Sequence, residues 1–157
     1  MSPRSFAALC LLALPALLDG AVEIVRVWPS YREADSFRRI GEYLGGRENA
    51  GRDTVLRSQS EARAGYYFLT RVATDAATPV SSLVVEVVLP GNPEVRTFAF
   101  PVTLGAGEGV FHLGLTGSDW PGPDTRPAAW RLTARAADGA TVAELASFLW
   151  STPAGAK

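Results

Sequence analysis

The chain has almost no residues for metal or thiol chemistry. Its one cysteine is Cys10 and its one histidine is His112. An internal disulfide needs two cysteines, and a zinc site needs several cysteine or histidine ligands. The sequence therefore excludes a disulfide framework within the chain and speaks against a transition-metal site. We predict no metal ion and no other cofactor.

Lysine is nearly absent as well. Lys157 is the only one, against fourteen arginines, and the formal net charge is −1. Proteins that bind nucleic acid concentrate positive charge on one face. The charge balance therefore predicts no nucleic-acid partner. The preference for arginine over lysine is typical of a GC-rich genome and favours a bacterial source.

Long hydrophobic runs are missing except at the amino terminus. Arg4 gives that end a positive charge, and residues 6–18 follow without a charged side chain. A membrane-crossing helix needs roughly 20 apolar residues. The shorter run instead matches the apolar region of an export signal, and it contains Cys10. We predict a signal peptide over residues 1–21 and a mature chain without a membrane span.

The predicted cleavage site lies near Gly20 or Ala21, after Sec-type export. Signal peptidase selects small residues at the last position and two positions before it. Gly20 and Ala21 suit the last position, whereas Leu18 and Asp19 suit the earlier one poorly. The sequence favours a periplasmic or secreted protein, and an uncleaved amino-terminal anchor remains the alternative.

The rest of the chain consists of short strand-like runs separated by turn residues. These runs cover residues 22–28, 65–74, 82–89, 95–104, 109–115, 129–136 and 141–150. Apolar and polar residues alternate within several of them, which is typical of antiparallel sheets with one buried face. We predict a mainly-β fold, a single antiparallel immunoglobulin-like or fibronectin-III-like β-sandwich of about seven strands. A closed barrel is the alternative.

A polar insertion at residues 31–64 interrupts this pattern. The single domain would span residues 22–153, with a short tail at 154–157. Within the insertion, Val55 and Leu56 form one weak apolar cluster that could make a short edge strand.

One short helix is predicted inside the insertion, after the first strand. Phe37, Ile40 and Leu44 recur at the spacing of one helix face. We expect this face to cover Tyr67 or, alternatively, Tyr66 on the strand that follows the insertion.

The last two runs predict a hairpin. A two-residue turn at 138–139 would pair Leu132 with Leu145 on the buried face. The same register would place Phe148 and Trp150 on the wet face, which is unfavourable for two large aromatic residues. We therefore predict a β-bulge between Leu145 and Phe148 that returns both rings to the core.

No catalytic constellation is predicted. His112 alternates with the apolar residues of its strand and should point away from the core. Ser118 follows it, but the Gly-x-Ser-x-Gly motif of a serine hydrolase does not surround that serine. No residue is therefore assigned a catalytic role.

Paired carboxylates could hydrolyse glycosides, but nothing in the sequence brings two of them together. Glu23, Glu86 and Glu144 all lie on predicted strands. Cross-strand pairing with arginine is the better interpretation, with Glu144 expected near Arg131 or Arg135.

The loop at residues 116–127 is the one candidate site for a ligand. Trp120 lies in this Pro- and Gly-rich loop between Asp119 and Arg126. A tryptophan flanked by polar groups can stack on a sugar or anchor a protein contact. Trp120 could instead fold back as a lid over the core. A calcium ion bound by the loop's aspartates is a weaker alternative.

The other three tryptophans are predicted to belong to the core. Trp130 lies in the buried register of its strand, and Trp28 and Trp150 lie at strand ends. The sequence as a whole predicts an exported, non-catalytic module that either binds another envelope protein or has a structural role as an accessory to a larger assembly. A carbohydrate-binding module using Trp120 is the alternative, and a hydrolase is the third possibility.

Overall fold

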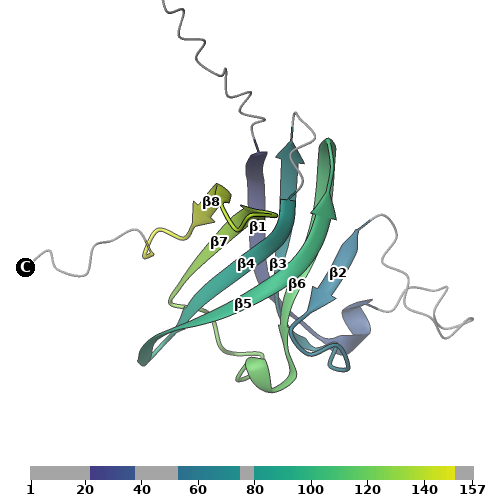
Figure 1. Cartoon of the computed structure of the whole chain (residues 1–157). Helices are drawn as coiled ribbons and strands as arrows, with labels where there is room; N and C mark the ends of the chain where they lie inside the picture. The colour runs from purple at the N-terminus through teal and green to yellow at the C-terminus, as the bar shows by residue number, and fades with distance from the viewer. Residues whose placement is uncertain (1–21, 38–52, 75–79, 151–157) are drawn as a thin grey trace, which may run out of the picture.

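The computed structural model describes residues 22–37, 53–74 and 80–150, which form two stacked sheets (Figure 1). The first sheet has the order β1 (Val22–Arg32), β3 (Gly65–Thr74), β6 (Gly107–Thr116) and β2 (Thr54–Arg57). The second has the order β5 (Asn92–Leu104), β4 (Val80–Leu89), β7 (Ala129–Ala136) and β8 (Thr141–Ala146). Two 3₁₀ turns, η1 (Ala34–Phe37) and η2 (Gly117–Asp119), follow β1 and β6.

The predicted β-sandwich is confirmed, with eight strands instead of about seven. Without β2, three strands of one sheet face four of the other, as in immunoglobulin-like and fibronectin type III domains. The extra strand is the one expected at Val55 and Leu56. It pairs with β6 in parallel, whereas every other described pairing is antiparallel.

Alternating apolar residues of both sheets build the core. Leu83, Val85 and Val87 of β4 face Leu113 and Leu115 of β6, and all five are fully buried. Burial of each such side chain contributes roughly 1.5–3 kcal/mol. The core therefore depends on the period-two pattern that the sequence shows.

β1 continues four residues beyond the predicted end at Trp28. The expected stop was Pro29, which cannot donate a main-chain hydrogen bond. β1 is an edge strand among the described strands, however, and Pro29 lies opposite Phe68 of β3. A proline is tolerated there because its nitrogen can face outward.

The outer face of the first sheet is covered, as expected for the insertion. The Phe37 ring packs on Tyr67 with 4.5 Å between ring centroids, and it is buried. The observed element at this point is the 3₁₀ turn η1. Ile40 and Leu44, which complete the predicted helix face, lie outside the described residues.

The register of the final hairpin is confirmed, although its turn differs. Leu132 lies opposite Leu145. The loop is three residues long, closed by hydrogen bonds from Gly139 N to Ala136 O and from Ala136 N to Ala140 O. The pairing of β7 with β8 then shifts by one residue between Arg135 and Ala134. This shift offsets the extra loop residue, so Leu132 still lies opposite Leu145.

The predicted bulge after Leu145 is wrong. β8 ends at Ala146, and a turn carries the chain away from the sheet. Phe148 is 84% exposed and Leu149 is 61% exposed. Trp150 lies on the outer face, where its ring centroid is 4.9 Å from the Arg131 guanidinium carbon.

Trp28 is also misplaced by the prediction. A register irregularity between Ile24 and Arg26 shifts the alternation of β1, so Val27 faces the core and Trp28 faces outward. Trp28 is 39% exposed and stacks with Arg26. The expected place of Trp130 is confirmed, since it packs against the core and meets Phe68 edge-on.

Within the described ranges, no helix is long and apolar enough to cross a membrane.

Replacing Gly114 with alanine tests how tightly the outer cover is packed. An added Cβ would overlap the Tyr67 ring, so we expect a loss of about 1–3 kcal/mol in the free energy of unfolding, measured in urea. Gly105→Ala is the matched control, because no atom lies within 4 Å of its added Cβ. Equal effects of the two changes would contradict this packing.

Candidate binding surfaces

Trp120 is buried as a lid on the core. Its backbone N–H donates to Gly117 O at 3.3 Å, which turns the side chain back toward the sandwich after η2. The ring stacks on Tyr66 at 4.5 Å with an interplanar angle of 23°, and only 5% of the residue is exposed. Of the two arrangements expected for Trp120, the structure shows the one without an exposed ring face. Its Nε1 is buried and has no hydrogen-bond partner among the described residues.

Arg126 lies near Trp120 through the same tyrosine. Its guanidinium carbon is 5.9 Å from the Tyr66 ring centroid, and its Nη1 donates to Pro123 O at 2.7 Å. Burial raises the pKa of Tyr66, and the positive charge of Arg126 partly opposes this rise. Arg126 therefore stabilises its own loop, while its exposed surface remains open to solvent.

Asp119 contacts the second sheet, through Arg96 of β5. Its main-chain oxygen accepts from Arg96 Nη1 at 2.9 Å, and its Oδ1 lies 3.6 Å from Arg96 Nη2. The three residues predicted to bind a ligand thus divide between two surroundings. Their ligand-binding role stays a prediction.

His112 points away from the sandwich core, as expected, but it does not face water. Asp53 and Phe37 cover it, with 3.0 Å between His112 Nε2 and Asp53 Oδ2. The residue is only 8% exposed, and within the described part of the chain its Nδ1 has no hydrogen-bond partner. A general base must reach the proton that it abstracts, and this imidazole lies beneath other side chains.

The strand carboxylates of the second sheet pair with arginine. Arg131 Nε donates to Glu86 Oε2 at 2.6 Å, and Arg131 Nη1 lies 3.7 Å from Glu144 Oε2. The hydrogen bond to Glu86 raises the pKa of Arg131. The predicted contact between Glu144 and Arg131 is confirmed. Glu23 lies on β1 of the other sheet, opposite Ala73.

Among residues 22–37, 53–74 and 80–150, no three His, Cys, Asp or Glu side chains cluster so as to hold a metal ion. In the loop at residues 116–127, the Asp119 carboxylate forms an ion pair with Arg96.

A groove between the two sheets is the feature that sequence reasoning missed. Its volume is about 400 Å³. One wall is Leu56 and Arg57 of β2 with the adjoining Ser58, and the other is residues 97–101 of β5. Asp119 lies at the groove as well. The sequence could indicate β2, but not that this strand and β5 from the other sheet would flank one groove.

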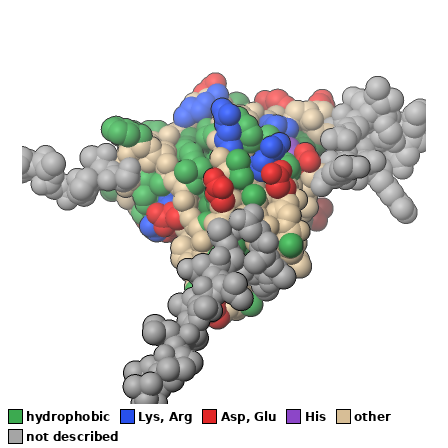
Figure 2. Space-filling model, turned by 90° about the horizontal axis from the view of Figure 1, so that it is seen from above, with side chains coloured by type: hydrophobic (Ala, Val, Ile, Leu, Met, Phe, Trp, Pro, Cys, Tyr) green, Lys and Arg blue, Asp and Glu red, His purple; other side chains and the backbone are tan. Residues whose placement is uncertain are grey.

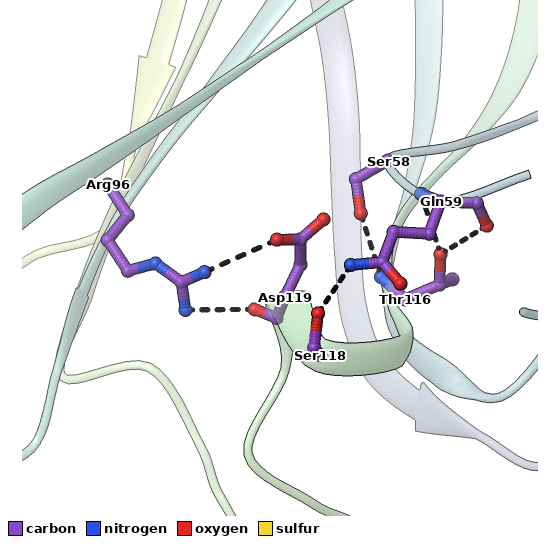
Figure 3. A network of polar contacts seen from close by, with 6 residues as sticks. All are labelled: Ser58, Gln59, Arg96, Thr116, Ser118 and Asp119. Carbon is purple, nitrogen blue, oxygen red and sulfur yellow. Dashed lines mark hydrogen bonds and ion pairs between the residues drawn. The ribbon is translucent and has the colours of Figure 1, made fainter.

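A polar network joins the two walls of the groove (Figure 3). Thr116 Oγ1 donates to Gln59 O and accepts from Gln59 N, and the Gln59 side chain donates to Ser118 Oγ at 2.6 Å. The next residue, Asp119, holds Arg96 of β5. A continuous path of contacts therefore runs from the end of β2 through η2 to β5.

These features define the class of the protein as a small immunoglobulin-like β-sandwich with an added edge strand. No family model and no curated protein matches the sequence. A solved structure with some similarity is an immunoglobulin-like protein from Pseudomonas aeruginosa, at 15% identity and a TM-score of 0.35. The match covers 82% of this chain and 96% of that chain. The fold assignment rests on the strand order described above.

Replacing Trp120 with alanine should primarily destabilise the protein. Removing a buried ring that stacks on Tyr66 is expected to cost about 3–5 kcal/mol in the free energy of unfolding. Trp28→Ala is the matched control, and we expect about 1 kcal/mol or less because that ring is partly exposed. Urea denaturation of both variants measures the difference. A Trp120 variant as stable as the parent protein would contradict the lid.

Proposed function

We propose that this chain is an exported, non-catalytic immunoglobulin-like module that binds another protein at the groove between β2 and β5. The observation that carries the proposal is the groove itself, because each of its walls is an edge strand among the described strands of its sheet. Edge strands present main-chain groups without a neighbouring strand, and proteins commonly pair such edges with another chain.

The surroundings of the titratable residues support a non-catalytic role. His112 is covered, and Glu86 and Glu144 pair with Arg131. Catalytic groups need access to a substrate and a pKa suited to proton transfer. These three side chains are instead used in packing and ion pairing.

The charge pattern favours a protein partner over a nucleic acid. On the face seen from above, Arg, Asp and Glu side chains are interspersed with hydrophobic ones, and no single-sign patch dominates it (Figure 2). Mixed charge of this kind is typical of surfaces that contact proteins or water.

Carbohydrate binding through Trp120 has less support. Sugar stacking requires an open aromatic face, and the Trp120 ring stacks on Tyr66 with 5% of the residue exposed. The groove beside Asp119 is therefore the preferred binding surface.

Site-specific crosslinking tests the proposed surface. A photoreactive amino acid at Ala99, an exposed position of the groove, should crosslink to a protein in envelope extract. The same substitution at Thr141, which is exposed on the edge strand β8 across the second sheet, is the matched control. An adduct formed equally from both positions, or from neither, would count against the groove.

Export is tested by the intact mass of the chain recovered from producing cells. We expect a mature form that begins close to Val22 in the periplasmic or culture fraction, because residues 1–21 match a cleavable signal. A full-length chain retained in the membrane fraction would instead support the uncleaved anchor.

A further inference from the structure

We propose that the groove binds an extended, uncharged segment of a partner protein, which pairs with β5 as one additional strand. This inference rests on the proposed function and specifies its chemistry. The proposed contacts are mainly main-chain hydrogen bonds to Val95, Thr97 and Ala99.

The pairing of β4 shows which main-chain groups of β5 face the groove side. Val88 O accepts from Ala128 N at 2.8 Å, so the main chain at Val88 is directed toward the β7 side of β4. On β5, the residue opposite Val88 is Val95. In an antiparallel ladder, hydrogen-bonded and non-hydrogen-bonded pairs alternate. Val95 therefore belongs to a non-hydrogen-bonded pair, and its N–H and C=O point away from β4.

The main-chain orientation found at Val95 repeats along β5, because the pairing of β5 with β4 is regular. Residues 95–101 pair without interruption with residues 82–88 of β4, so Thr97 and Ala99 share the orientation of Val95. Pro101 has the same parity and lies opposite Ser82. A proline in a sheet is placed with its nitrogen away from the neighbouring strand. The position of Pro101 thus agrees with the direction inferred from Val88.

The opposite wall also presents main-chain groups. Ser58 N donates to Gly114 O at 2.8 Å, so Ser58 and, by alternation, Leu56 direct their main chain toward β6. The main-chain groups of Val55 then face away from β6, on the opposite side of β2. Both walls can therefore supply hydrogen bonds to an extended chain.

The side chains around the groove favour an uncharged segment. Leu56, Phe98 and Phe100 provide apolar surface. Arg57 directs its guanidinium elsewhere, donating to Tyr67 Oη and lying over Phe37. Arg96 and Asp119 already neutralise each other. A charged side chain inside the groove would lose hydration without gaining an opposite charge.

The walls also limit what can enter. A folded sheet that paired edge-to-edge with β5 would bring a second layer against β2, whereas one strand needs only the width of a single chain, about 4.8 Å per strand. The volume of about 400 Å³ is at the small end of ligand sites. An isolated extended segment therefore fits better than the edge of a folded domain.

Backbone NMR of the mature chain with a defined probe tests the proposal. The probe is an acetylated and amidated peptide of alternating threonine and valine, seven residues long. In the free protein, the amides of Val95, Thr97 and Ala99 should exchange with solvent faster than those of Arg96, Phe98 and Phe100. Saturating probe, at about 1 mM, should slow exchange of the first set and shift its signals. A probe with aspartate in place of valine should bind more weakly.

Two substitutions at one position separate main-chain pairing from side-chain contact. Ala99→Pro removes one donor at the free edge and should weaken probe binding about tenfold. Ala99→Ser keeps that donor and is the matched control, with urea denaturation verifying that both variants are folded. Equal binding by the two variants, signal changes outside β5 and β2, or no binding of the probe would overturn the proposal.

The experiments distinguish failure of strand addition from failure of the proposed function. If the peptide fails while the crosslink at Ala99 persists, strand addition is wrong and the groove still binds protein by another mode. If both fail, the proposed function fails as well.

Discussion

The parallel pairing of β2 with β6 is the constraint on which the distinctive features of this protein depend. Seven strands already form a complete sandwich, and β2 extends one sheet by a single short strand. Four residues of parallel pairing stabilise a strand only weakly by themselves. Thr116 supplements them by exchanging hydrogen bonds with both the N–H and the C=O of Gln59, and its own N–H donates to Ser58 Oγ at 3.0 Å.

This pairing creates two surfaces at once. Asp53, just before β2, binds His112 and helps to cover the outer face of the first sheet. The other side of β2 forms a wall of the groove opposite β5. The buried histidine and the proposed binding surface are therefore consequences of the same added strand.

The sequence predicted the parts of the fold that depend on local pattern. β3 and β7 occupy the residue ranges expected from their apolar alternation, and the Leu132–Leu145 pair agrees with the buried-face alternation of β7 and β8, although their turn differs from the predicted one. The prediction from alternation failed for Trp28, because one local irregularity in β1 exchanges the inward-facing and outward-facing positions of the strand. It also failed where the chain leaves the sheet, as after Ala146.

The candidate site was less predictable than the fold. Alternation places His112 on the outer face, but it cannot show that Asp53 and Phe37 cover that face. Similarly, a loop tryptophan has two possible positions, and only packing against Tyr66 decides between them. The groove joins segments about forty residues apart, and no local signal in either strand indicates the other.

The most direct test of this account is amide hydrogen exchange at Leu56 and Ser58 in the parent protein and in Thr116→Val. Valine keeps the shape of threonine but removes the hydroxyl that binds Gln59, at a cost of about 1–3 kcal/mol. We expect protection of both amides in the parent and a loss of roughly ten- to hundredfold in the variant, with core amides such as Val85 less affected. Equal protection of Leu56 and Ser58 in the two proteins would contradict the central role of Thr116 in holding β2.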